Sequence, residues 1–283
     1  DWQGQRWVML DAAFAHLLGP LQARYPSFQW DILGGSDASP VERRMVDAAE
    51  QVFARVRAIL GDKPREPVLL QILAGNDGEW ADVAGALGSL LRSAAQENPR
   101  LRGQFIALAP DSRWEDAGRV LQDNARKGAA TESAVHYLEG VRRIARLREL
   151  DAVPGPVVWP WKSGGVYLIT GGAGGLGMIF AEDIVQRVGA ATIVLAGRSA
   201  PGDTQRARQK ALEAHGADVR VIHRVLDVTD EHAVRGCVAD ILGEYGRLDG
   251  VIHSAGLIRD NYVIRKSDSE FRDVLDPKVR GTV

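Results

Sequence analysis

Residues Gly165-Val-Tyr-Leu-Ile-Thr-Gly-Gly-Ala-Gly-Gly-Leu-Gly177 carry the pattern that decides the fold of the chain. The run from Val166 to Ile169 is apolar and partly β-branched, which is typical of a buried parallel strand. Five glycines follow within seven residues, and residues 178–185 then show helical spacing. A strand, a glycine turn and a helix predict a dinucleotide-binding turn, because glycine lets the backbone approach a pyrophosphate that the helix N-terminus faces. A glycine-rich surface loop is the alternative, and the flanking strand and helix disfavour it.

The composition narrows the classes of protein to which the chain can belong. Its 283 residues suffice for one large domain or two smaller ones. Lys and Arg number 35 against 37 Asp and Glu, so the net charge of −2 gives no support for a nucleic acid or an anionic membrane as partner. Cys237 is the only cysteine, which excludes an internal disulfide and suits a reducing cytoplasm. We find no run that could span a bilayer and no signal peptide, and we expect no bound metal. Both ends, Asp1 and Val283, are expected to be cuts from a longer polypeptide.

Strands alternate with helices in the first half of the chain. Apolar runs predict strands at residues 7–11, 28–33, 67–74 and 104–109, with helices at 12–25, 41–60 and 84–95. Alternation of this kind favours βαβ units and a parallel sheet. The helix at 41–60 has the clearest amphipathic spacing, and we expect Gly61 to cap it.

The first half lacks a phosphate-binding glycine turn. Its nearest candidate, Gly75-Asn-Asp-Gly78, has few glycines, and Asp77 would repel a phosphate. Residues 135–147 predict two short strands that turn at Glu139-Gly140, and the proline- and glycine-rich segment 151–156 predicts a boundary between two lobes. We therefore expect residues 1–150 to form a degenerate, structural lobe that binds no nucleotide.

The second half, residues 151–283, repeats the pattern with stronger signals. After the glycine turn we expect strands at 191–196, 219–223 and 248–256, and helices at 203–215, 231–245 and 271–283, the last interrupted by Pro277. Thr229 is the expected N-cap of the helix at 231–245. The predicted fold class is α/β, with two Rossmann-like lobes on parallel sheets, of which the second binds the nucleotide.

Three further groups of residues are expected near the nucleotide, because ligands of a doubly wound sheet bind outside the carboxyl ends of its strands. Arg198, beside Ser199, holds the place where an acidic residue would select NAD, so its guanidinium favours the 2′-phosphate of NADP(H). A plain surface arginine is the alternative. Asp227 is expected to reach the adenine amino group or else to close a turn. The small residues of Ser254-Ala-Gly256 would let the nicotinamide ribose lie close to the strand.

Five motifs together resemble the β-ketoreductase domains of modular polyketide and fatty acid synthases, which belong to the short-chain dehydrogenase/reductase superfamily. In order, they are Thr170-Gly-Gly-Ala-Gly-Gly-Leu-Gly177, Ala196-Gly-Arg-Ser199, Leu226-Asp-Val228, Val251-Ile-His-Ser-Ala-Gly256 and Pro277-Lys-Val-Arg-Gly-Thr282. Residues 90–99 and 135–140 also resemble the structural subdomain of that family. The resemblance implies NADPH-dependent reduction of a β-ketoacyl thioester on acyl carrier protein, among neighbouring synthase domains.

The resemblance also implies roles for individual residues. Lys278 matches the catalytic lysine, whose charge lowers the pKa of a proton-donating tyrosine while a serine polarises the ketone. A solvated helix lysine is the alternative. The serine and tyrosine are expected some tens of residues beyond Lys278, so the 283 residues alone are expected to be inactive. Cofactor binding is expected of Thr170, Gly171, Gly172, Gly174, Gly175, Leu176, Gly177, Arg198, Ser199, Asp227, Val228, Ser254, Ala255 and Gly256.

The segment after Gly256 bears on catalysis and on stereochemistry. Tyr262 and Lys266 have the Tyr-x-x-x-Lys spacing of a catalytic pair, but we reject them because they precede the strand and helix that would bring a tyrosine over the nicotinamide. Ketoreductases that give the D-alcohol resemble one another in a Leu-Asp-Asp segment here. Ile258-Arg-Asp260 keeps only its last residue, so Asp260 is expected to orient the substrate and weakly favours the D-alcohol.

Two alternatives to an active ketoreductase domain stay open at this point. The chain could be a non-catalytic or split ketoreductase-like domain of a synthase that still binds NADP(H). It could also be a free-standing NADP-dependent short-chain dehydrogenase with a small alcohol as substrate, although the large first lobe argues against this reading.

Overall fold

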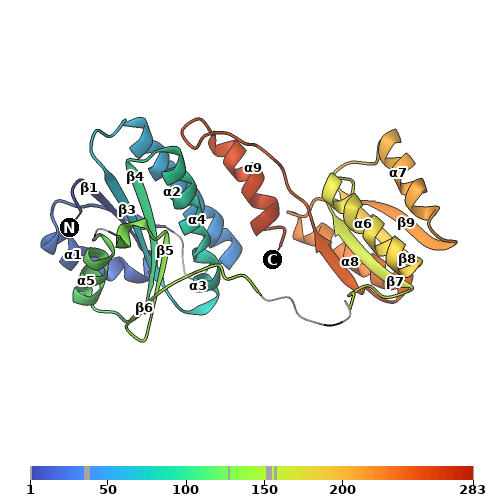
Figure 1. Ribbon diagram of the computed structural model, residues 1–283, viewed down its shortest axis with the longest axis horizontal. Coiled ribbons are helices and arrows are strands. Elements are labelled where there is room, and N and C mark those ends of the chain that lie inside the picture. Colours follow the sequence, from blue (N-terminus) through green and yellow to red (C-terminus); the bar gives the residue numbers. More distant parts are fainter. Residues whose placement is uncertain (1, 35–38, 127, 151–154, 156–157, 283) are drawn as a thin grey trace. The chain divides into compact units, whose positions relative to one another are not determined.

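The computed structural model describes residues 2–34, 39–126, 128–150, 155 and 158–282 (Figure 1). The chain divides into two compact units, one made of Asp1–Leu150 with Arg259–Arg272, the other of Asp151–Ile258 with Asp273–Val283. Most of the segment 151–156, where we expected a boundary, lies outside the described residues. Each unit carries a largely parallel sheet with helices, which confirms the predicted α/β class. No helix in the described parts of the chain has the length and apolar character needed to cross a membrane.

The first unit is built on a six-stranded sheet with the order β2-β1-β3-β4-β5-β6. The sheet is parallel except for β6, which pairs with β5 in the antiparallel sense across a turn at Glu139 and Gly140, both with positive φ, as the sequence predicts. The strands are β1 (Gln5–Asp11), β2 (Gln29–Leu33), β3 (Val68–Gly75), β4 (Leu101–Leu108), β5 (Ala134–Leu138) and β6 (Val141–Ile144).

Helices cover both faces of this sheet, so every residue of the central strand β3 is buried. The helices are η1 (Ala12–Leu17), α1 (Leu18–Arg24), α2 (Val41–Gly61), α3 (Gly78–Ala84), α4 (Ala86–Glu97), α5 (Trp114–Asn124) and η2 (Ala129–Thr131). One buried cluster joins η1, α1 and α5 to β1, β3 and β4, and α2 and α4 lie on the opposite face (Figure 1).

Three details of the first unit differ from the sequence prediction. The helix expected at 12–25 is a 3₁₀ turn followed by a short α-helix. Gly61 is the last residue of α2 rather than its cap, and Lys63 takes the left-handed conformation instead, with φ of 51°. The short helices α3 and α5 were not predicted at all.

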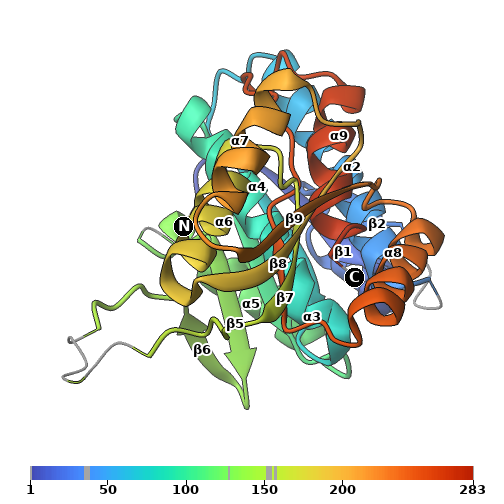
Figure 2. The same ribbon diagram turned by 90° about the vertical axis from the view of Figure 1, so that its right-hand side faces the viewer.

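The second unit is built on a four-stranded parallel sheet with the order β10-β7-β8-β9 (Figure 2). Its strands are β7 (Gly165–Thr170), β8 (Ala190–Gly197), β9 (Asp218–Val225) and β10 (Gly250–His253), and its helices are α6 (Gly175–Val188), α7 (Asp203–Glu213) and α8 (Glu231–Tyr245). A further helix, α9 (Asp268–Val279), begins in the segment grouped with the first unit and ends in the second.

The strand β7 is buried on both faces because its side chains alternate between two hydrophobic clusters. Tyr167 and Ile169 pack with α6 and α7, whereas Val166 and Leu168 pack with α8. The chain adds β8 and β9 on one side of β7 and β10 on the other. The strand order therefore reverses between β7 and β10, which is the position where doubly wound sheets bind ligands.

The N-cap of α8 is Asp230. The sequence predicts Thr229 at this position, so that prediction is wrong. The Asp230 carboxylate accepts a hydrogen bond from the Ala233 amide at 3.0 Å. Thr229 instead donates its hydroxyl to Asp227. Either side chain suits an N-cap, so the sequence alone did not separate two adjacent candidates.

A buried carboxylate ties the loop before β10 to the start of β7. Asp249 accepts hydrogen bonds from Nε of Arg247 at 2.7 Å and from the Val166 amide at 3.0 Å, and Lys162 lies 3.3 Å away. The Arg247 guanidinium, followed by the Val166 amide, holds the pKa of Asp249 well below its usual range. This carboxylate is thus ionised in the folded chain across the ordinary pH range.

We expect Asp249→Asn to lower the free energy of unfolding by about 1–2 kcal/mol at neutral pH, since the cationic partners are half exposed and screened by solvent. The pKa of Asp249 is lower in the folded than in the unfolded chain. Its contribution is therefore complete above the unfolded value of about 4 and is lost as the pH falls toward the folded value. Urea unfolding at neutral pH and at about pH 3 should show the gap between the two proteins shrinking in acid. A gap that stays constant would contradict this role.

Candidate cofactor-binding site

Three of the five glycines in the turn after β7 are required by close backbone contacts. Gly171 has a φ of 64°, and a Cβ there would lie 2.6 Å from the Ser254 carbonyl oxygen. A Cβ on Gly172 would lie 2.7 Å from the Ile169 carbonyl oxygen, and one on Gly177 would lie 2.6 Å from Gly172 Cα. Real side chains do not fit at these distances. The turn is therefore pressed against the ends of β8 and β10.

The other two glycines shape the start of α6. Gly174 is the N-cap of the helix, and a Cβ on Gly175 would meet open space. The backbone amides of Gly175, Leu176 and Gly177 open the helix, where N–H groups lack intrahelical acceptors. A helix start of this kind favours a bound anion, since these donors and the helix dipole act together.

A pocket of about 640 Å³ lies at the carboxyl ends of all four strands of the second unit. Its predicted members are Gly171, Gly174, Arg198, Ser199, Asp227, Val228, Ser254, Ala255 and Gly256. Thr170, Gly172, Gly175, Leu176 and Gly177 do not belong to the lining, although they form the strand end, the turn and the helix start beside it. The volume is in the range of small-molecule and cofactor sites.

Arg198 directly follows β8 and is exposed at the rim of the pocket. Its guanidinium makes no hydrogen bond or ion pair with the part of the chain that the structure describes. Asp227 lies close enough for the Arg198 charge to lower the pKa of its carboxyl, although the larger cause is the hydrogen bond from the Thr229 amide. The pocket therefore presents a cation to which no described residue is bound by a hydrogen bond or an ion pair, although the Asp227 carboxylate lies near it.

Asp227 closes a turn, which is one of the two roles that its position suggests. Its Oδ1 accepts from the Thr229 amide at 2.9 Å and from the Thr229 hydroxyl at 2.8 Å. Such an Asx turn fixes the carboxylate. The second oxygen, Oδ2, has no hydrogen bond to a described residue and stays available to a ligand.

Several pocket residues were not predicted from the sequence. Gln205 lies in the first turn of α7, where its Oε1 accepts from the Gly202 amide at 2.7 Å. Its spacing of three residues from the N-cap is a capping signal that could have placed it there. The others are Ala173, Gly197, Leu226, Thr229, Leu257, Asp273, Asp276 and Pro277.

Lys278 stands beside the pocket, and Asp260 is not among its lining residues. A Cβ built on Gly256 would lie 3.9 Å from Lys278 Nζ, so the lysine head lies close to the end of β10. Asp260 falls in the segment grouped with the first unit. Tyr262 and Lys266 share that segment; Tyr262 is exposed, and Lys266 donates to the Arg259 carbonyl.

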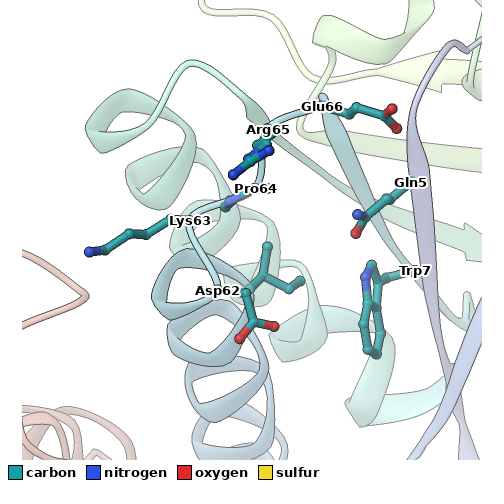
Figure 3. A pocket seen from close by; sticks show the side chains of 8 residues that line it. Gln5, Trp7, Asp62, Lys63, Pro64, Arg65 and Glu66 are labelled. Carbon is teal, nitrogen blue, oxygen red and sulfur yellow. The ribbon is translucent and has the colours of Figure 1, made fainter.

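A second hollow, of about 450 Å³, lies in the first unit (Figure 3). It is lined by Gln5 and Trp7 of β1, by Ile59, and by Asp62, Lys63, Pro64, Arg65 and Glu66 between α2 and β3. Gln5 begins β1, and Glu66 lies just before β3. This hollow is therefore at the amino ends of parallel strands, the end that ligands of such sheets do not use.

The donors of the pocket in the second unit suit a phosphorylated dinucleotide. Gly171 and Gly172 have no side chains, so a phosphate can approach their backbone. The start of α6 offers amide donors, and Arg198 offers a cation. Within the described residues we find no group of His, Cys, Asp and Glu side chains that could hold a metal ion.

Comparisons with known proteins identify the family to which the chain belongs. Residues 165–283 match the KR domain family. Polyketide synthase PksN of Bacillus subtilis (strain 168) is 41% identical over 246 residues, which cover 87% of this chain and 4% of the synthase. Polyketide synthase PksL of the same strain is 34% identical over 247 residues, again 87% of this chain and 5% of the synthase. The chain thus spans only a small part of these relatives.

A solved structure resembles the chain along its whole length. It is a ketoreductase domain from the bacillaene assembly line, with a TM-score of 0.90 and 29% identity, and the match covers 100% of this chain and 66% of that one. A ketoreductase from the macrolactin assembly line matches with a TM-score of 0.71 at 20% identity, over 99% of this chain and 66% of the other, and so supports the fold alone.

The glycine turn can be tested by two alanine substitutions. Gly171→Ala should lower the free energy of unfolding by roughly 1–3 kcal/mol, because positive φ and the Ser254 carbonyl both oppose a side chain. Gly175→Ala is the matched control, since its Cβ meets open space and alanine favours a helix; we expect no loss of stability. Urea unfolding of both variants makes the comparison. Similar losses for the two would show that the turn is not packed as described.

Proposed function

The chain is a ketoreductase domain of the polyketide synthase type, within the short-chain dehydrogenase/reductase superfamily, and on that premise we propose that it binds NADPH and takes part in reducing a β-ketoacyl thioester to a β-hydroxyacyl thioester on acyl carrier protein. The observation that carries the proposal is the strand-end pocket of the second unit, where a bare glycine turn and an unpaired arginine lie together. When bound, the reduced nicotinamide would supply the hydride that the ketone accepts.

Individual residues divide the work of binding in this proposal. The turn at Gly171 and Gly172 and the first amides of α6 would hold the pyrophosphate. Arg198, with Ser199 beside it, would pair with the 2′-phosphate, because a guanidinium can bind two phosphate oxygens at once. Asp227 Oδ2 would accept from the adenine amino group. Ser254, Ala255 and Gly256 would line the nicotinamide end of the pocket.

Lys278 would supply the positive charge of the catalytic centre. A cation close to a phenol lowers the pKa of that phenol and so makes it a better proton donor at neutral pH. No tyrosine belongs to the described lining of the pocket. In our proposal Lys278 acts together with a proton-donating tyrosine and a ketone-polarising serine. Asp260 would orient the thioester and favour the D-alcohol.

The first unit would serve as a structural lobe. A crevice of about 630 Å³ does lie at the carboxyl ends of its strands, but the lining includes Asp11, Asp77 and Glu79. The nearest arginine, Arg44, pairs with the buried Asp11 at 2.6 Å. Because its arginine is paired with a carboxylate, the described lining of this crevice offers a phosphate no unpaired cation.

The alternative is a non-catalytic or split ketoreductase-like domain that still binds NADP(H). It differs from the reductase in one respect, namely that the bound cofactor reduces no thioester. The test measures NADPH oxidation by the complete protein with a β-ketoacyl carrier protein. Turnover supports the reductase. NADPH binding without turnover supports the alternative, and failure to bind NADPH contradicts both.

Arg198→Ala tests the choice of cofactor. We expect the variant to lose about 1.5–3 kcal/mol of NADPH binding energy, roughly a ten- to hundredfold weaker affinity, with little change for NADH, because only NADPH carries the 2′-phosphate. Arg208→Ala is the matched control, since Arg208 is an exposed arginine of α7 outside the pocket lining. Fluorescence titration with both nucleotides gives the affinities. Equal losses for the two nucleotides would show that Arg198 does not read the 2′-phosphate.

A further inference from the structure

The end of α9 has an unusual acceptor at Pro277. Proline has no N–H and interrupts the hydrogen-bond ladder of the helix in which it lies. Past it, the amides of Arg280 and Gly281 both donate to the Asp276 carbonyl, at 2.9 Å and 3.2 Å. The Pro277 carbonyl therefore receives neither of these amides. It is satisfied instead by a side chain from β10, with His253 Nε2 at 2.9 Å.

His253 makes a second contact through its other nitrogen. Nδ1 lies 2.8 Å from the hydroxyl of Thr170, the last residue of β7 and the neighbour of Gly171. The Thr170 carbonyl in turn accepts the amide of Ser254 at 3.1 Å and its hydroxyl at 2.6 Å. The ring of His253 thus connects the ends of β7 and β10 to the end of α9.

The chemistry of the two partners fixes the proton on this ring. A carbonyl oxygen can only accept, so Nε2 must carry the hydrogen that it donates to Pro277. In a neutral ring Nδ1 is then an acceptor, and the Thr170 hydroxyl donates to it. The Pro277 contact therefore requires the Nε2–H tautomer. The Thr170 hydroxyl can pair with the ring in that state, so neither contact is left unsatisfied.

The residue that follows Pro277 is Lys278, whose Nζ lies close to Gly256 as described above. Its ammonium makes no hydrogen bond or ion pair with the described residues, so no polar contact of its own fixes its position. The backbone around it is fixed instead. His253 holds Pro277 on one side, and on the other Gly281 packs so tightly that a Cβ there would lie 2.8 Å from Val228 Cγ2.

We propose that His253 is a positioning residue of the cofactor site: as the Nε2–H tautomer it holds the Pro277 carbonyl and thereby places Lys278 beside the end of β10. This inference rests on the proposed function, since it concerns a lysine that would face the cofactor. It assigns His253 no contact with the cofactor and no proton transfer.

The first measurement needs no cofactor. A ¹H–¹⁵N multiple-bond spectrum of the histidine rings, recorded where they are neutral, should show His253 as the Nε2–H tautomer, with its signal assigned through His253→Gln. A proton on Nδ1 would overturn the proposal, because the bond to Pro277 could not then form. This outcome does not depend on whether the chain binds NADPH.

The second measurement asks whether His253 acts through Lys278. Asn keeps a polar group near Thr170 but is too short for Pro277, whereas Gln carries an amide nitrogen at about the reach of Nε2. We expect His253→Asn to weaken NADPH binding roughly two- to tenfold, the effect of one lost hydrogen bond. His253→Gln should restore most of the affinity. In a Lys278→Gln background the Asn substitution should have almost no effect on binding, because the two residues are coupled.

The outcomes separate this proposal from the proposed function. An equal loss of affinity with and without Lys278, or a loss that Gln does not restore, would overturn the role of His253 and leave NADPH binding intact. A wild-type chain that fails to bind NADPH would overturn the function, and the tautomer spectrum would still decide whether His253 holds Pro277. Circular dichroism of each variant verifies that it is folded. If His253→Asn is unfolded, the tautomer spectrum and the NADPH affinity of His253→Gln decide the role of His253.

Discussion

The second unit depends on a close approach between backbones at the end of β7. The turn after this strand passes so near to β8 and to the end of β10 that no side chain fits at Gly171 or Gly172, and the turn itself leaves no room for one at Gly177. A Cβ at any of them would displace main-chain atoms, which unlike flexible side chains have no other position to take. The turn is fixed in this way. The start of α6, the residues that follow β8 at Arg198 and those that follow β10 at Ser254 all lie around one pocket.

The two units show how one architecture yields different strand ends. In the second unit the lining of the pocket includes glycines, three carboxylates and Arg198, whose guanidinium makes no ion pair with a described residue. In the first, the arginine of the corresponding crevice, Arg44, pairs with Asp11. The buried guanidinium of Arg6 lies within the core, where Gln71, Gln122 and the Leu121 carbonyl accept its hydrogen bonds. Burial lowers the pKa of Arg6 to about 10. The guanidinium of Arg6 hydrogen-bonds within the core of the first unit and is therefore not accessible to a ligand.

Much of the fold was predictable because local and tertiary signals agree. The helix at 231–245 was predicted with the bounds that α8 has, since its apolar face, the preceding polar cap and the following Gly246 all indicate the same limits. The order of the strands was not predictable, because spacing along a sequence does not say on which side of β7 the strand β10 adds. The choice of Asp230 over Thr229 as N-cap depended on the Asx turn at Asp227, a contact visible only in three dimensions. The places of Gln205, Asp273 and Asp276 in the pocket lining were not predicted for the same reason, since they too depend on contacts visible only in three dimensions.

The two outer strands of the second sheet differ in how they would behave toward another molecule in solution. β9 carries Asp218, Arg220 and Arg224, charges of the kind that discourage a further strand from adding to an edge. β10, Gly250-Val-Ile-His253, carries no lysine, arginine or acidic residue. It pairs with β7 alone among the described strands, and Val251 is more than half exposed. An apolar edge strand without charged side chains can pair with a strand of another chain. Of the two outer strands, β10 is therefore the one to which a further strand could add.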